Sequence, residues 1–140
     1  MNGRYFLDTN IFVYSFDRES PDKAGRAVEL IHHAVTAGTG VVSFQVVHEF
    51  FNVALRRFAQ PMTAAEAQQY LSTVFRPLLA VHSSVSLYSE SLRMHAAYSL
   101  SWYDALIVAA AIESECSVLY TEDLQAGLRI GPLTVKDPFR

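Results

Sequence analysis

Short apolar segments alternate with longer segments of helical periodicity, and this alternation restricts the fold more than any other feature of the sequence. The apolar segments cover residues 4–7, 41–42, 78–81 and 117–120, with a further candidate at 133–135. Each is too short for a helix, whereas the segments between them carry apolar residues three and four positions apart. Short buried strands that alternate with helices are typical of parallel sheets. We therefore expect an α/β fold with a central parallel sheet of four to five short strands and helices on both faces.

Several of the predicted helices have recognisable ends. Ser20-Pro21 is a typical start, and the helix that follows ends at Gly38. Ser43 is expected to cap the next helix, and Thr63–Glu66 has the pattern of a capping box. Pro77 is expected beyond the end of that capped helix, since proline interrupts helices. A short helix is predicted directly after residue 8, and two further helices are predicted at residues 84–98 and 101–114.

Length and composition fit one domain over residues 1–140. The chain has 140 residues, 51% of them hydrophobic, which is enough for one core. The single cysteine, Cys116, has no partner for an intrachain disulfide, which favours a reducing compartment. The N-terminal residues lack the pattern of a signal peptide, and the apolar run 105–112 is too short to span a bilayer. We expect a soluble cytoplasmic protein with no membrane partner.

The charge balance neither requires nor excludes a nucleic-acid partner. The net charge is −3 and the calculated pI is about 5.9, unlike the basic surface of a protein that holds nucleic acid by bulk electrostatics. A site built from acids would account for part of this balance, because its bound cations add charge that the sequence does not count.

Acidic residues follow two of the most hydrophobic predicted strands. Asp8 comes directly after the first strand, and Asp123 follows the fourth. An aspartate at such a junction can serve as a helix cap or a turn residue, so neither is decisive alone. Ligands of parallel sheets bind at the carboxyl ends of the strands, however, and two acids at that edge favour a functional site.

Two more acids are candidates on other grounds. Asp104 is the third helical position after Ser101, which fits a capping box, but the helix that follows is apolar on every side. A carboxylate at the mouth of a buried helix needs a partner, which a metal ion would supply. Glu49 lies on a polar stripe with Gln45, Asn52 and Arg56, which a solvated helix face explains well. Glu49 joins the site only because its helix starts at the same edge of the sheet.

Other site chemistries fit less well. The five histidines lack the spacing of zinc ligands, and the sequence has neither a glycine-rich phosphate loop nor a nucleophile-elbow serine. A phosphatase with Asp8 as covalent nucleophile, in the manner of haloacid dehalogenases, would have a second aspartate at position 10. That position is Asn10.

The sequence resembles the PIN domain family, with its motifs in the same order. The closest resemblance is to VapC-type toxins of bacterial and archaeal toxin–antitoxin pairs, and it extends from Arg4 to Phe139. The matching segments are Phe6–Asn10, Ser43–Glu49, Trp102–Ala111 and Tyr120–Leu124.

The resemblance implies roles for individual residues. It makes a metal-binding catalytic quartet of Asp8, Glu49, Asp104 and Asp123, in which Asp8 and Asp104 are the central ligands. Small polar residues beside these acids would support them or contact the substrate phosphate, namely Thr9, Asn10, Ser43 and Thr121. Glu122 competes with Asp123 as the fourth acid.

The resemblance also implies a function. It predicts an endoribonuclease, the toxin of a type II toxin–antitoxin system, that hydrolyses RNA with a bound Mg²⁺ or Mn²⁺ ion. Such hard cations prefer oxygen ligands and relieve the repulsion within a carboxylate cluster. The implied partners are an RNA substrate, a small cognate antitoxin and a second copy of the chain in a homodimer. The alternative is a non-catalytic PIN-like module that binds RNA or protein, although the presence of all four acids favours an enzyme.

Overall fold

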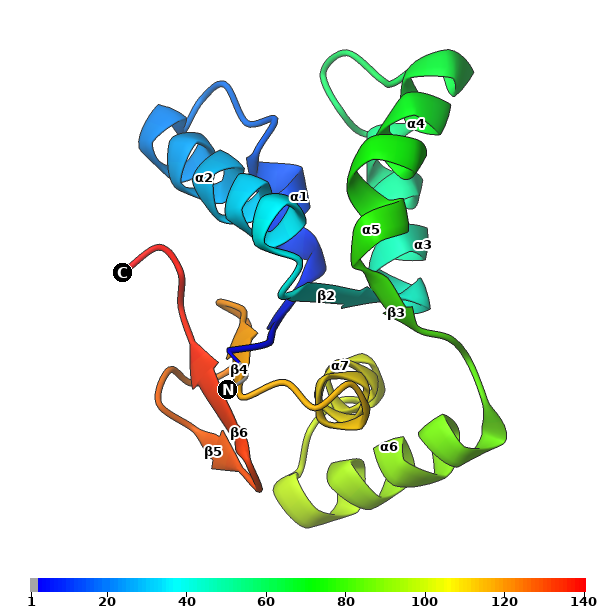
Figure 1. Cartoon of the computed structure of the whole chain (residues 1–140), viewed down its shortest axis with the longest axis vertical. Coiled ribbons are helices and arrows are strands. Elements are labelled where there is room, and N and C mark those ends of the chain that lie inside the picture. The colour runs from blue at the N-terminus through cyan, green and yellow to red at the C-terminus, as the bar shows by residue number, and fades with distance from the viewer. Residues whose placement is uncertain (1–2) are drawn as a thin grey trace.

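The protein is built around one twisted sheet, seen in the computed structural model that describes residues 3–140 (Figure 1). Within these residues the sheet has six strands in the order β3–β2–β1–β4–β6–β5. The strands are β1 (Tyr5–Leu7), β2 (Gly40–Ser43), β3 (Leu79–Val81), β4 (Val118–Tyr120), β5 (Arg129–Ile130) and β6 (Leu133–Lys136). Neighbouring strands are parallel except β5 and β6. The predicted α/β class and parallel sheet are confirmed, and β5 is an additional strand of two residues.

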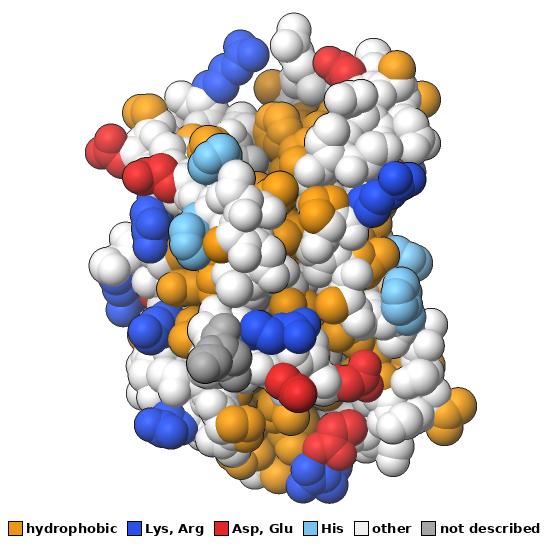
Figure 2. Space-filling model, viewed as in Figure 1, with side chains coloured by type: hydrophobic (Ala, Val, Ile, Leu, Met, Phe, Trp, Pro, Cys, Tyr) orange, Lys and Arg blue, Asp and Glu red, His pale blue; other side chains and the backbone are white. Residues whose placement is uncertain are grey.

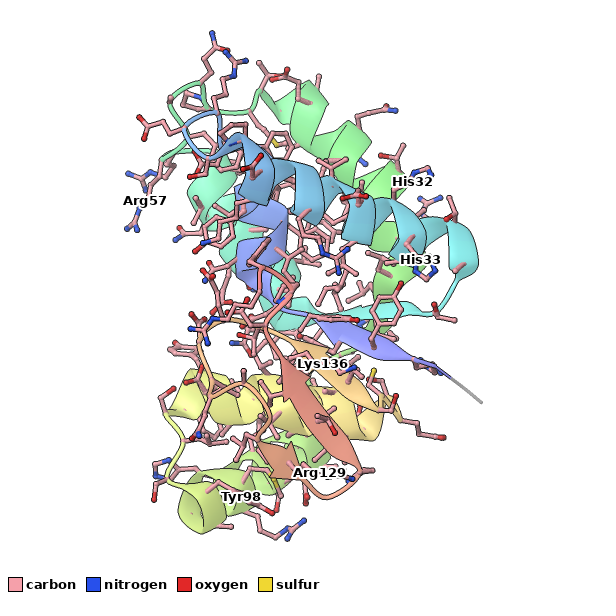
Figure 3. All side chains as sticks on the ribbon, turned by 90° about the vertical axis from the view of Figure 1, so that its left-hand side faces the viewer. His32, His33, Arg57, Tyr98, Arg129 and Lys136 are labelled. Carbon is pink, nitrogen blue, oxygen red and sulfur yellow. The ribbon has the colours of Figure 1, made fainter. Side chains whose placement is uncertain are left out.

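Helices cover both faces of the sheet, as predicted (Figure 1). The helices of the first face are α1 (Thr9–Tyr14), α2 (Pro21–Ala37), α3 (Phe44–Ala54), α4 (Ala64–Tyr70) and α5 (Arg76–Leu78), with the π-helical turn η1 (Leu71–Phe75) between the last two. The other face carries α6 (Val85–Tyr98) and α7 (Trp102–Glu113). Figure 3 shows α7 lying between α6 and the strands, which accounts for the burial of residues 105–111.

The caps agree only partly with the sequence pattern. The capping box is present, since the Glu66 N–H donates to Thr63 Oγ1 at 3.1 Å and the Thr63 N–H donates to Glu66 Oε1 at 2.9 Å. Ser20 and Ser43 precede their helices as predicted, but neither hydroxyl makes a capping hydrogen bond. The Ser43 hydroxyl is buried and has no partner among residues 3–140.

The prediction that a helix ends before Pro77 is wrong. The helical path continues from α4 through η1 into α5, so that Pro77 lies inside its last turn. In η1 the Arg76 N–H donates to the Leu71 carbonyl, a wider turn than in an α-helix. A proline has no N–H to donate and its ring crowds the preceding turn, so a widened turn just before Pro77 relieves the conflict.

An aromatic cluster fixes the two helices that begin beside the predicted site. The fully buried Phe12 of α1, Phe50 of α3 and Phe75 of η1 pack together. The Phe12 and Phe75 ring centroids are 5.1 Å apart, and those of Phe50 and Phe75 are 5.4 Å apart. Buried aromatic pairs of this kind contribute beyond their buried area. The positions of α1 and α3 are therefore set by the core.

The surface has no single dominant charge on the face shown in Figure 2, where acidic and basic side chains are interspersed among apolar ones. This agrees with the modest net charge of −3. Within residues 3–140, no helix combines the length and apolar character needed to cross a membrane. The predicted domain boundaries include residues 1–2, which lie outside the described residues.

Candidate active site

The predicted acids gather at one edge of the sheet because β1, β2 and β4 are parallel neighbours. Asp8 follows β1, Asp123 follows β4, and Glu49 lies one turn into α3, which begins where β2 ends. All three line a single cleft with a volume of about 350 Å³. The remaining lining residues are Thr9, Asn10, Val13, Asn52 and Val53.

Asp8 is the most buried of these acids, with 7% of its surface exposed. Its Oδ1 accepts a hydrogen bond from the Thr9 N–H at 2.7 Å, so it caps α1 as well as facing the cleft. Its Oδ2 accepts from the Thr121 hydroxyl at 2.7 Å. Burial raises the pKa of Asp8 to about 6, although both hydrogen bonds act in the opposite direction. The capping and functional interpretations of Asp8 are therefore compatible.

Asp123 is exposed at the rim of the cleft. Its N–H donates to Thr121 Oγ1 at 3.1 Å, and its Oδ1 has a long contact of 3.5 Å with the Asn10 amide. Partial burial raises the pKa of Asp123, and the negative charge of Asp104 adds to this rise. Asp104 thus lies close enough to act electrostatically on Asp123, although it does not line the cleft itself.

Asp104 is held at the first turn of α7. Its N–H donates to the Ser101 hydroxyl at 3.2 Å, which confirms that Ser101 caps this helix. Its carboxylate is half-buried at the positive end of the α7 dipole. None of the salt bridges among the described residues involves Asp104, Asp8, Glu49 or Asp123. Within residues 3–140 these acids therefore have no cationic partner.

Glu49 is held through both carboxylate oxygens, one by a residue of α1 and the other by a residue of its own helix α3. Oε1 accepts from the Thr9 hydroxyl at 2.6 Å, and Oε2 accepts from the Gln45 amide at 3.3 Å. The expected solvated stripe of α3 is correct for the exposed Asn52 but wrong for Gln45, which is only 5% exposed. Arg56 is exposed but lies beyond the end of α3. Gln45 packs toward the start of α7, a contact that helical periodicity cannot indicate.

Glu122 is engaged outside the cleft. It accepts a hydrogen bond from the Tyr14 hydroxyl, and Lys23 Nζ lies 3.1 Å from Oε2. Burial raises the pKa of Glu122, but the hydrogen bonds from Tyr14 and Lys23 and the lysine charge outweigh it and leave the pKa below its ordinary value. The Lys23 ammonium also lies 3.9 Å from the centroid of the Tyr14 ring. These contacts favour Asp123 over Glu122 as the fourth acid.

The small polar residues fall into two groups. Thr9 and Asn10 line the cleft, although Thr9 is only 8% exposed and its hydroxyl donates to Glu49. Ser43 and Thr121 are only 1% and 2% exposed and are not among the residues that line it. The Thr121 hydroxyl is committed to Asp8 and the Asp123 N–H, so it supports two acids at once.

The oxygen ligands in the cleft suit an ion such as Mg²⁺, which keeps some of its waters, better than a metal held entirely by protein side chains. Within residues 3–140, no three histidine, cysteine, aspartate or glutamate side chains converge closely enough to hold a metal by themselves. Mg²⁺ usually keeps several waters and takes only one or two carboxylates from the protein. Carboxylates that face an open cleft without cationic partners, one of them deeply buried, fit such an ion.

A larger groove of about 1010 Å³ adjoins the acid cleft, and Val13 lines both. Its walls include Phe16 and Phe58 together with Arg18 and Arg57. Figure 3 shows Arg57 pointing outward at the edge of the molecule, whereas His32 and His33 lie at the opposite side on α2. The two histidines are therefore remote from this groove.

The strand order, the helices on both faces of the sheet and the acids that follow β1 and β4 together define a class of small α/β domains with an acidic cleft. The sequence profile of the PIN domain matches residues 5–127, and the chain belongs to the PIN domain family. The predicted family resemblance is thereby confirmed. The chain has no significant match among curated protein sequences.

Several solved structures share this fold. A toxin–antitoxin complex from Klebsiella pneumoniae is 20% identical, with a TM-score of 0.66, and the match covers 96% of this chain and 97% of that one. VapBC2 from Rickettsia felis, bound to a promoter DNA fragment, is 20% identical with a TM-score of 0.64 and coverage of 94% and 96%. VapC20 from Mycobacterium tuberculosis, a toxin that cleaves the sarcin–ricin loop, is 22% identical with a TM-score of 0.61 and coverage of 85% and 89%.

Proposed function

We propose that this chain is a metal-dependent endoribonuclease and the toxin of a type II toxin–antitoxin pair. The observation that carries the proposal is the cleft in which buried Asp8 lies with Glu49 and Asp123 and has no cationic partner in the part of the chain that the structure describes. Membership of the PIN domain family and a shared fold with toxin structures support it.

The proposed cofactor is Mg²⁺ or Mn²⁺, held centrally by Asp8 and Asp104 and supported by Glu49 and Asp123. When bound, such an ion supplies Lewis acidity and a more acidic water for phosphodiester hydrolysis. The products we expect are RNA fragments with 5′-phosphate and 3′-hydroxyl ends.

The chain's own residues prepare the site for this chemistry. Asp8 is fixed through both oxygens, by the Thr9 N–H and the Thr121 hydroxyl, so little reorganisation accompanies ion binding. The Thr9 hydroxyl ties Glu49 to the start of α1. Asn10 lines the cleft, where its amide has a long contact of 3.5 Å with Asp123 Oδ1, and we propose that this amide donates to a phosphate oxygen of the substrate. We assign Thr9 and Asn10 to substrate contact, and Thr121 to support of the acids. A supporting role for Ser43 rests on the family resemblance alone, because its buried hydroxyl has no hydrogen-bond partner among residues 3–140.

RNA is the substrate that we infer. VapC20, which shares the fold, is a toxin that cleaves the sarcin–ricin loop. Exposed aromatic side chains, Trp102 and Tyr103, directly precede Asp104, and such groups can stack on unpaired bases. Because the net charge is −3, binding would depend on the ion and on local contacts more than on bulk attraction.

A small cognate antitoxin is the protein partner that we infer, since the Klebsiella and Rickettsia structures are toxin–antitoxin assemblies. The groove beside the acid cleft offers a place for it, because a peptide on Phe16 and Phe58 could continue past Val13 to the acids. We also propose a homodimer, by analogy with the family. A PIN-like module that binds RNA or protein without cutting is the second candidate.

The proposal is tested with partner-free protein and a pool of cellular RNA. We expect discrete cuts in Mn²⁺ or Mg²⁺ whose 5′-phosphate ends are mapped by ligation and sequencing. The cuts should vanish in EDTA and in Asp8→Asn, and persist in Asp22→Asn, a matched control on the exposed first turn of α2. Folded protein that binds RNA equally well in EDTA and leaves it intact would favour the binding module.

A further inference from the structure

Gln45 is a buried amide that joins two parts of the candidate site. Its Nε2 donates to Glu49 Oε2 at 3.3 Å and to the Tyr103 carbonyl at 3.2 Å. Glu49 is on α3, whereas Tyr103 directly precedes Asp104 at the start of α7. The Gln45 side chain therefore contacts Glu49 and also the backbone carbonyl of the residue just before Asp104.

The two acceptors determine which way the amide faces. A carboxylate and a carbonyl oxygen both need a donor, and only the NH₂ group of Gln45 provides one. The opposite orientation would place Oε1 against two other acceptor oxygens. The arrangement seen is therefore the one that satisfies hydrogen bonding at Glu49 and Tyr103.

Packing alone does not explain an amide at this position. Oε1 of Gln45 is buried and has no hydrogen-bond partner among residues 3–140. Burying an acceptor without a donor costs free energy, so an apolar side chain of similar length would pack at least as well. The amide is explained by the two hydrogen bonds that its Nε2 donates, to Glu49 and to the Tyr103 carbonyl.

We propose that Gln45 is a positioning residue that sets the direction of the Glu49 carboxylate and fixes α3 against the start of α7. Glu49 is then held from two sides, by Gln45 on Oε2 and by Thr9 on Oε1. Without Gln45, Oε2 is free to rotate and Asp104 loses its link to α3. The proposal rests on the proposed function, because it concerns the geometry of the same acids.

The test compares Gln45→Met, which keeps length and burial but loses the donor, with Gln68→Met, an exposed control on α4. Mn²⁺ binding without RNA is measured by calorimetry, and cleavage is measured separately. We expect Gln45→Met to lose on the order of 10–100-fold in Mn²⁺ affinity or cleavage rate, as is typical when a residue that orients a ligand is removed. Its thermal midpoint should not fall, and Gln68→Met should match the wild type.

A double-mutant cycle separates positioning from a general structural effect. If Gln45 acts in part through Glu49, Gln45→Met should lower the Mn²⁺ affinity less in the Glu49→Gln background than in the wild type, and the remaining loss is the part that acts through the start of α7. Equal losses in both backgrounds, or no loss in the single variant, would overturn the proposal. Should Gln45→Met unfold, Gln45→Asn keeps the amide but shortens its reach and should show the same loss.

The two proposals fail in different ways. Wild-type protein that neither binds Mn²⁺ nor cuts RNA would refute the proposed function and this inference with it. Wild-type protein that does both, beside a Gln45→Met variant that is equally active, would refute only the role of Gln45.

Discussion

The Thr121 hydroxyl donates a 2.7 Å hydrogen bond to Oδ2 of Asp8, which joins the residues that follow β4 and β1. The same hydroxyl accepts from the Asp123 N–H, so one threonine sets the position of two acids. The bond to Asp8 is buried and therefore protected from competing water, whereas the bond from the Asp123 N–H is partly buried. The carboxylates are thus arranged before any ligand arrives.

Removal of this hydroxyl should raise the pKa of Asp8 further. Thr121→Val keeps the shape of the side chain but loses the donor, and that hydrogen bond favours the charged carboxylate. In metal-free protein, an NMR titration should find the Asp8 pKa above its wild-type value of about 6. Thr36→Val, on the exposed surface of α2, is the control and should leave it unchanged. An unchanged Asp8 pKa in Thr121→Val would show that the hydroxyl does not act on Asp8.

The stability of the metal-free protein should fall as the pH rises through the range in which Asp8 titrates. The folded pKa of about 6 lies above the ordinary value of 3.8, so the folded state binds the proton more tightly. The contribution of Asp8 to the free energy of unfolding is therefore fully present below about pH 4 and is lost as the pH rises through 6. The loss is on the order of 2–3 kcal/mol.

Urea unfolding in EDTA at pH 4 and pH 7 measures this effect. Asp8→Asn cannot titrate, so its stability should depend less on pH than that of the wild type by about the same amount. Equal pH dependence in the two proteins would mean that Asp8 has an ordinary pKa. Mn²⁺ should restore stability to the wild type at pH 7, because it binds the folded state.

The fourth acid can be assigned by a pair of substitutions. Asp123→Asn should lower the cleavage rate strongly, because Asp123 lines the cleft. Glu122→Gln should leave the rate close to the wild type and lower the stability by about 0.5–1 kcal/mol, since it weakens the ion pair with Lys23. Cleavage rates and urea unfolding of both variants give the answer. The reverse pattern of rates would assign the fourth acid to Glu122.

The sequence predicts those parts of the molecule that follow from local patterns. Asp8 and Asp123 come directly after apolar runs, so the edge of the sheet on which they meet follows from strand direction alone. The strand β5 is only two residues long and exists through its pairing with β6, so no periodicity reveals it. Pro77 was placed wrongly because the π-turn before it depends on the path of the chain between helix and strand.

Gln45 illustrates the limit for the site. On α3 it lies four positions before Glu49 and looks like part of a solvated stripe. Its burial arises from contact with Tyr103, which is 58 positions further along the chain. Such a contact depends on how α7 packs against α3, and helical periodicity contains no information about it.

The decisive measurement is the RNA cleavage rate as a function of Mn²⁺ concentration, with wild type, Asp8→Asn, Asp104→Asn and Asp22→Asn compared on the RNA that the pooled assay identifies. We predict that the rate saturates with Mn²⁺ in the wild type and in Asp22→Asn. It should fall to background in EDTA and in both site variants, while all four proteins stay folded. Wild-type cleavage that persists in EDTA, or full activity in Asp8→Asn or Asp104→Asn, would contradict a metal-dependent site built on these acids.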